Sequence, residues 1–206
     1  MIPGLILAAG RSERMGRSKA LLPCGAGGEP FVRVLARALC AGGVADVIVV
    51  GRTDAADLRA EVEAVEAVEV TSLPVRFVEN ADADAGQLSS LLAGLGVADR
   101  PGVRAILMTP VDAPLVTAGT VARLLAEFSS SGAPIVRAMH HGVHGHPVIF
   151  SRAVFGELRR ADPSLGAKAV LRAHERAIRN VEVDDPGVVA DIDTPEDYQA
   201  IFGRPL

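Results

Sequence analysis

A short segment near the N-terminus combines small residues with a high density of positive charge. Its small and basic members are Ala8, Ala9, Gly10, Arg11, Arg14, Arg17 and Lys19. Small residues let a backbone approach a ligand closely and direct amide N–H groups toward it. Arginine and lysine add charge-assisted hydrogen bonds to phosphate oxygens. We interpret the segment as a phosphate-binding loop, although it lacks both GxxxxGK[ST] and GxGxxG. The alternative is a solvated basic loop that only caps a strand.

Acidic residues in two later segments could hold a metal ion. Asp112 follows an apolar run, and Asp191 and Asp193 alternate around Ile192, so both would face one side of an extended chain. Mg²⁺ prefers one or two carboxylates together with phosphate oxygens and water. The spacing alone leaves an ordinary turn equally open for Asp112. Glu196 and Asp197, which follow Thr194-Pro195, indicate helix capping rather than metal binding.

Two polar segments remain. Asn80 precedes a Gly86-Gln87-Leu88-Ser89-Ser90 helix entrance, which could bind an anion or a base edge or could be a simple capped helix. Four of the five histidines lie between 140 and 146. Clustered histidine in a glycine-rich turn suggests a metal site, but a solvated hairpin between two strands is the interpretation we favour.

Short apolar runs alternate with amphipathic, helix-like segments along the chain, and their spacing predicts the elements. Strands are expected at 2–8, 46–50, 75–78, 104–108, 135–139, 147–150 and 178–183. Helices are expected at 31–41, 55–68, 88–95, 117–128, 154–160, 167–173 and after Thr194. This alternation predicts an α/β fold with a mostly parallel sheet and crossover helices, in which ligands bind beyond the carboxyl ends of the strands. We expect one domain over 1–206, with about 134–184 as a small lobe.

Composition excludes several classes of function. The 206 residues carry a net charge of −4 and only 3% aromatic residues, which argues against nucleic-acid binding. Mean hydropathy is high at +0.30, but no apolar run reaches the roughly 18 residues of a membrane span. The N-terminus lacks the basic start of a signal peptide, so we expect a cytoplasmic protein. Cys24 and Cys40 show no metal or disulfide spacing.

The segment LAAGRSERMGRSKALLP resembles the signature loop of the molybdopterin nucleotidyltransferase-like NTP transferase family. The resemblance implies a Rossmann-like three-layer sandwich of the nucleotidyltransferase, glycosyltransferase-A-type fold. It also implies that Arg14 and Lys19 act on the triphosphate. The nucleotide-binding residues that it implies are Leu7, Ala8, Ala9, Gly10, Arg11, Asn80, Gly86, Ser89 and Ser90.

Other segments extend the resemblance. TPVDAP and DIDTPED are similar to the family's metal-binding segments, which implies Mg²⁺ on Asp112 and on Asp191 or Asp193. GHPVIF resembles an acceptor-side motif, which implies that His146 lies near the second substrate and that the 134–184 lobe is on the acceptor side. The pair Ala8-Ala9 resembles the branch that uses CTP, and the GAKAVLRAH segment resembles enzymes whose acceptor is molybdopterin.

The function implied is the transfer of CMP from CTP to a phosphorylated acceptor, with release of pyrophosphate. The resemblance also implies that such an enzyme binds a molybdoenzyme as its protein partner. A sugar- or polyol-phosphate nucleotidyltransferase and a non-catalytic nucleotide-binding regulator remain as alternatives. The acidic residues argue against the regulator, because such a protein would need no metal site.

Overall fold

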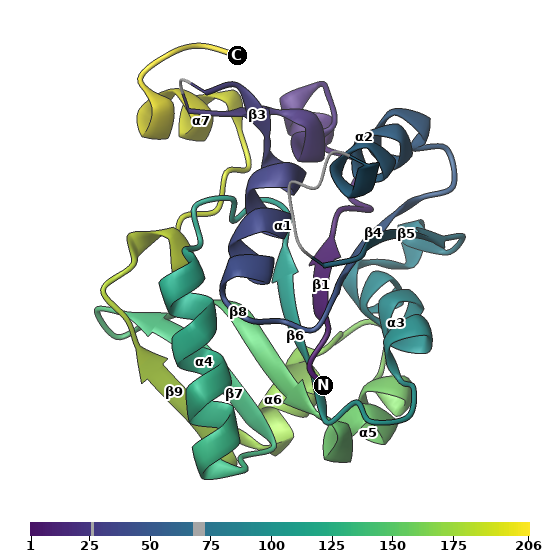
Figure 1. Cartoon of the computed structure of the whole chain (residues 1–206), viewed down its shortest axis with the longest axis vertical. Coiled ribbons are helices and arrows are strands. Elements are labelled where there is room, and N and C mark those ends of the chain that lie inside the picture. Colours follow the sequence, from purple (N-terminus) through teal and green to yellow (C-terminus); the bar gives the residue numbers. More distant parts are fainter. Residues whose placement is uncertain (26, 68–72) are drawn as a thin grey trace.

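A seven-stranded sheet forms the centre of the molecule (Figure 1). The computed structural model describes residues 1–25, 27–67 and 73–206. The sheet has the order β5-β4-β1-β6-β8-β7-β9. Its strands are β1 Gly4–Leu7, β4 Val47–Arg52, β5 Val75–Asn80, β6 Ala105–Pro110, β7 Ile135–His140, β8 Val143–Ser151 and β9 Ile178–Glu182. All neighbours pair in parallel except β8, which is antiparallel to both β6 and β7.

Helices cover both faces of this sheet (Figure 1). They are α1 Phe31–Ala41, α2 Ala56–Ala67, α3 Gln87–Ala98, α4 Ala118–Ser131, α5 Phe155–Arg160, α6 Lys168–Ala173 and α7 Pro195–Phe202. Residue 68, which was expected to end α2, lies outside the described residues. A separate pair of two-residue strands, β2 Pro23–Cys24 and β3 Glu29–Pro30, was not predicted.

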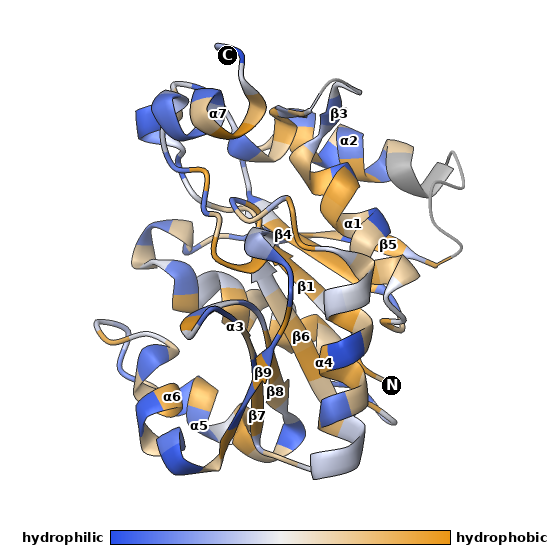
Figure 2. Ribbon diagram, turned by 90° about the vertical axis from the view of Figure 1, so that its left-hand side faces the viewer, coloured by the Kyte–Doolittle hydropathy of each residue, from blue (hydrophilic) through white to orange (hydrophobic). Residues whose placement is uncertain are grey.

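The strands are buried on both faces because successive side chains point to opposite sides. In β1, Ile6 packs with α1, α2 and α4, whereas Leu5 and Leu7 pack with α3 and α5. Figure 2 shows these central strands as a continuous hydrophobic layer. The predicted three-layer, mostly parallel α/β sandwich is therefore confirmed.

The histidine-rich segment is a tight hairpin, and this corrects the prediction of a turn over 140–146. Strand β8 begins at Val143, and only His141 and Gly142 form the turn. Both have positive φ angles, 48° and 79°, as the favoured two-residue hairpin turn requires. The three strands between 135 and 182 belong to the main sheet. The assignment of 134–184 to an acceptor remains a prediction.

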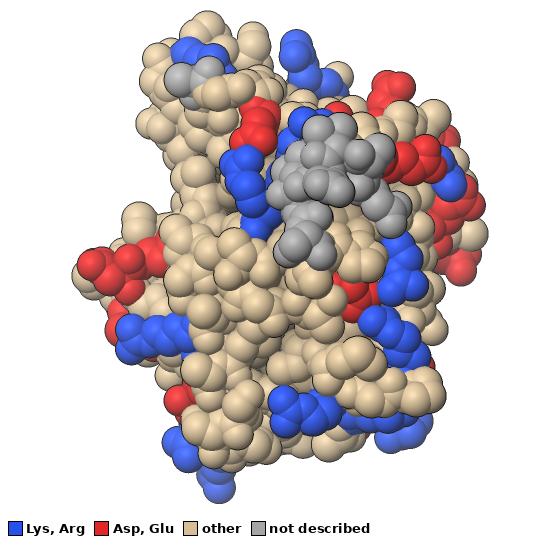
Figure 3. All heavy atoms as spheres, in the orientation of Figure 1, with Lys and Arg blue, Asp and Glu red and all other residues tan. Residues whose placement is uncertain are grey.

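Charged side chains are dispersed on the face drawn in Figure 3. Outside the grey atoms, the basic and acidic groups there form small separate clusters. None of the described helices combines the length and the hydrophobicity that crossing a membrane would require.

Candidate functional site

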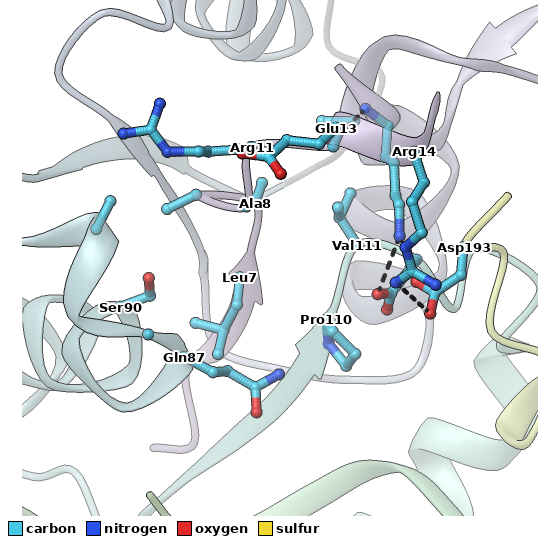
Figure 4. A pocket seen from close by; sticks show the side chains of 18 residues that line it. Leu7, Ala8, Arg11, Glu13, Arg14, Gln87, Ser90, Pro110, Val111 and Asp193 are labelled. Atoms are coloured by element: carbon cyan, nitrogen blue, oxygen red, sulfur yellow. Dashed lines mark hydrogen bonds and ion pairs between the residues drawn. The ribbon is translucent and has the colours of Figure 1, made fainter. Parts of the chain in front are cut away.

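A cavity of about 510 Å³ opens at the carboxyl ends of β1 and β6 and beside the start of α3. This is the edge of a parallel sheet where the sequence predicts ligand binding. The predicted site residues that line it are Leu7, Ala8, Ala9, Gly10, Arg11, Arg14, Lys19, Gly86, Ser90, Asp112 and Asp193. Figure 4 shows Gln87 and Ser90 on the α3 side, facing Leu7, with Arg14 and Asp193 on the opposite wall.

The two predicted catalytic cations meet at one carboxylate. Lys19 Nζ lies 2.5 Å from Asp193 Oδ1, and Arg14 Nη2 lies 3.0 Å from Asp193 Oδ2. Hydrogen bonding from Lys19, followed by that from Arg14, lowers the pKa of Asp193. The Lys19 side chain is only 12% exposed, and its backbone N–H donates to Ser12 Oγ. The loop therefore presents a fixed ammonium group to the cavity, whereas Arg17 is exposed and lines no part of it.

Asp112 lies on the other side of Lys19, with 3.7 Å between Asp112 Oδ2 and Lys19 Nζ. Its Oδ1 atom is buried and has no hydrogen-bond partner within the described chain. Burial raises the pKa of Asp112, and the neighbouring Asp191 and Asp193 add to that effect while Lys19 opposes it. A buried oxygen without a partner is costly unless a ligand satisfies it.

Asp191 and Asp193 flank the buried Ile192 and line two adjoining cavities. Asp193 lines the first cavity, whereas Asp191 lines the second. Residues 190–193 form no strand, and the expectation that both acids face one side stays a prediction. Ile192 is instead fully buried and donates its N–H to the Asp112 carbonyl at 2.8 Å. Asp197 forms a capping box with Thr194, as predicted.

The acids do not form a complete metal cage. Among the described residues, no three His, Cys, Asp or Glu side chains are grouped closely enough to hold an ion. Burial, followed by repulsion from Asp193, raises the pKa of Asp191. Together with the unpaired Asp112 oxygen, this excess of negative charge fits a divalent cation that takes its remaining ligands from a bound phosphate and from water.

Arg11 points away from the other two cations. It forms a bidentate ion pair with Asp84, which also binds Arg52, and Figure 4 shows it across the cavity from Arg14. Hydrogen bonds from Arg52 and Arg11 lower the pKa of Asp84 to about 2. Neither Arg52 nor Asp84 was predicted from the sequence, because Asp84 binds Arg11 and Arg52 from segments far apart in the chain.

Asn80 and Ser89 were predicted to bind nucleotide, but neither lines the first cavity. The buried Asn80 amide donates to Ser89 Oγ at 2.8 Å and to Ser90 Oγ at 3.0 Å. Ser89 Oγ in turn donates to the carbonyls of Asp82 and Gly86. In the described structure, Asn80 and Ser89 thus fix the loop before α3 and orient Ser90, which does line the cavity.

A second cavity, of about 620 Å³, adjoins the first on the side of β7 and β8. His146, predicted on the acceptor side, lines it, and its buried Nδ1 has no partner within the described chain. Burial lowers the pKa of His146, and Asp112 opposes this. Gln87 lines both cavities, although the sequence pattern placed it only at the entrance of a helix.

Residues 4–178 match the MobA-like NTP transferase domain. The chain belongs to this family. The matched range includes the loop after β1 and Asp112, and it ends before Asp193. The MobA-like family and the α/β nucleotidyltransferase fold place this chain among the nucleotidyltransferases.

Individual relatives span almost the whole MobA-like chain. The Bacillus subtilis purine catabolism protein PucB is 30% identical over 202 residues, which cover 96% of this chain and 94% of PucB. The crystal structure of Rv0371c from Mycobacterium tuberculosis is 27% identical, with a TM-score of 0.76 and 99% of each chain covered. The same Mycobacterium tuberculosis protein is also known in complex with manganese, with 28% identity, a TM-score of 0.71 and 98% of each chain covered.

Proposed function

We propose that this chain transfers CMP from CTP to a phosphorylated acceptor, molybdopterin, in a Mg²⁺-dependent reaction that releases pyrophosphate. The observation that carries the proposal is the position of Lys19 between Asp112 and Asp193 in a cavity formed by the small-residue loop. The family resemblance also implies a molybdoenzyme as the protein partner, and we expect the enzyme to act in the cytoplasm.

The donor would lie in the first cavity. The backbone of Ala8, Ala9 and Gly10 would approach the nucleoside, and the Ala9 methyl group leaves less room beside the base than glycine would, which favours cytosine. Arg11, Gly86 and Ser90 also line this cavity and would contact the nucleotide. Asn80 and Ser89 would not contact the nucleotide; they would hold Ser90 in position to do so.

Transfer needs little covalent chemistry from the protein. An oxygen of the acceptor phosphate attacks the α-phosphorus, and the bond from that phosphorus to the β-bridging oxygen breaks, so that pyrophosphate leaves with the electron pair. Lys19 and Arg14 would hold the triphosphate in line and neutralise the charge that develops on its oxygens. Asp193 keeps both cations in place before the substrate arrives.

Asp112 with Asp193 or Asp191 would hold Mg²⁺. When bound, the ion would supply positive charge to the triphosphate. The unpaired buried oxygen of Asp112 and the repulsion among the three acids support this assignment. The manganese complex of Rv0371c supports the use of a divalent ion.

Thermal unfolding with CTP, GTP, ATP and UTP, each with Mg²⁺, tests the donor. A ligand that binds only the native state stabilises it by about 2.7 kcal/mol at a concentration one hundred times Kd. We expect CTP to give the largest rise in Tm, and pyrophosphate to appear only when molybdopterin is added. A larger rise with another nucleotide would reject CTP, and no rise with any of them would reject nucleotide binding.

A further inference from the structure

Arg137 lies among apolar side chains on the sheet face that borders the second cavity. In β7, Ile135 packs in the core between the sheet and helices α3 and α5. Alternation puts Arg137 on the same face, where it lines the second cavity. Burial lowers the pKa of Arg137, and attraction to Glu175 opposes this. The side chain is half-buried, and because it lines the cavity its charge is available to an anionic ligand.

Within the chain, Arg137 contacts a neutral side chain. Its Nε and Nη2 atoms both donate to Asn180 Oδ1, at 3.1 and 3.0 Å. In the described structure it forms no ion pair with a carboxylate. Asn180 therefore orients the guanidinium without neutralising it.

A second cation lines the same cavity. The sequence contains only two lysines, Lys19 and Lys168. Lys19 lines the first cavity and Lys168 the second. Unlike Lys19, Lys168 forms no ion pair with any carboxylate in the described part of the chain.

The two ends of the second cavity differ in charge. Asp191 lines this cavity and is close enough to Asp112 to raise the pKa of that carboxyl group. It therefore lies at the end of the second cavity that is nearer to the first. His146 is also close enough to Asp112 to influence it. Along β8 the next residue on that face is Val148, and its partner across the ladder is Arg137. Arg137 therefore lies farther from the acids than His146 does.

Apolar side chains form the wall between these ends. Leu88, Met108, Val148 and Phe150 line the cavity. Val143 and Leu165 extend the apolar surface to its rim, where they are 57% and 48% exposed. The cavity thus suits a molecule with an apolar body and a negative group beyond it.

We propose that Arg137 and Lys168 anchor a second anionic group of the acceptor, separate from its reacting phosphate. The reacting phosphate would lie at the acidic end, near Asp112, and that part rests on the proposed function. The anchor would favour acceptors that carry negative charge at both ends over those that carry it at one.

Aldehyde labelling of the full chain tests this anchor. Pyridoxal 5′-phosphate condenses with an amine and loses water, and borohydride then reduces the imine. If Arg137 binds the phosphate, Lys168 should be labelled about tenfold faster by this reagent than by neutral pyridoxal, as one charge-assisted contact predicts. Peptide mass spectrometry separates Lys168 from Lys19 and from the Met1 amine. The rate at which 4-carboxybenzaldehyde labels Lys168, compared with the rate for benzaldehyde, measures the corresponding preference for a carboxylate.

Arg137→Gln should remove most of this preference, whereas Arg179→Gln, an exposed arginine on β9 that lines neither cavity, should leave it unchanged. Equal preferences in wild type and Arg137→Gln would overturn the anchor. If Arg137→Gln does not fold, the wild-type protein alone decides. A preference for the phosphate reagent that is no larger at Lys168 than at the Met1 amine would also reject the anchor.

CTP with Mg²⁺ separates the two proposals. It should protect Lys19 from labelling and leave Lys168 reactive. If CTP does not protect Lys19 while Lys168 still prefers the phosphate reagent, the proposed function is rejected and the anchor is kept. If CTP protects Lys19 while Lys168 shows no such preference, the proposed function is kept and the anchor is rejected.

Discussion

Lys19 Nζ and Asp193 Oδ1 lie 2.5 Å apart, although 174 positions separate these residues in the sequence. This contact closes the site, because it joins the loop after β1 to the segment before α7. Arg14 binds the other oxygen of the same carboxylate. Asp193 therefore orients both cations before any ligand binds.

Lys19→Ala should lower kcat by about 10²–10³-fold, the typical cost of removing one group that stabilises charge in a transition state. Asp193 would keep its contact with Arg14, so we expect the fold to survive. Pyrophosphate release measures the rate, and circular dichroism checks the fold. Arg17→Ala, in the same loop but outside the cavity, is the matched control and should retain full activity. Wild-type turnover in Lys19→Ala would contradict the assigned role.

Asp112→Asn should abolish the Mg²⁺-dependent part of stabilisation by nucleotide without lowering the stability of the free protein. Burial and two neighbouring acids raise the pKa of Asp112, so its charge opposes folding when no cation is bound. Thermal unfolding with CTP, with and without Mg²⁺, measures both effects. An undiminished Mg²⁺ response in this variant would exclude Asp112 as a ligand.

Asp185, which lines neither cavity, should make the free energy of unfolding fall at low pH. Burial raises the pKa of Asp185, but hydrogen bonds from Thr120, Thr117 and Gly187 outweigh it, so the net shift is downward. A lowered pKa stabilises the fold above the unfolded value of about 3.9, and this contribution is lost as pH falls through the folded pKa.

Asp185→Asn should therefore cost about 2 kcal/mol of unfolding free energy at pH 7. Urea titrations of wild type and variant should converge below about pH 4. A difference that stays constant from pH 7 to pH 3 would show that the loss is not electrostatic.

Gly145→Ala should lower the free energy of unfolding by about 1–3 kcal/mol or more. A Cβ atom there would lie 1.8 Å from the Val188 carbonyl oxygen, so the backbone that leads to Asp191 would have to move. Gly96→Ala is the matched control, since nothing lies within 4 Å of its Cβ position in α3. There the change should stabilise the helix by up to about 1 kcal/mol. Equal stabilities of the two variants in urea would contradict the close contact at Gly145.

Local patterns were sufficient to predict most of the fold. Helix α1 has the predicted bounds, 31–41, because its apolar residues recur at helical spacing and Gly42-Gly43 follows. Strand β8 was predicted to begin four residues too late, because His144 and His146 alternate with Val143 and Gly145 and so break the apolar run. Their side chains line a cavity, where polar residues are tolerated.

The part of the site that is formed by one continuous segment could be predicted from the sequence. The loop from Leu7 to Lys19 is continuous in sequence, and its composition alone indicates phosphate binding. Arg137 could not be found this way, because nothing near it in sequence shows that its strand borders a cavity. That Asp191 and Asp193 line different cavities could not be predicted either, because their alternation around Ile192 gives no position for the cavity walls.

The scarcity of lysine has a consequence for how this protein responds to chemical damage. Its two lysines line the two cavities, so acylating or carbamylating reagents find no other side-chain amine on which to react harmlessly. Such reagents would inactivate the protein while it remained folded, and loss of activity would precede any change in solubility or shape.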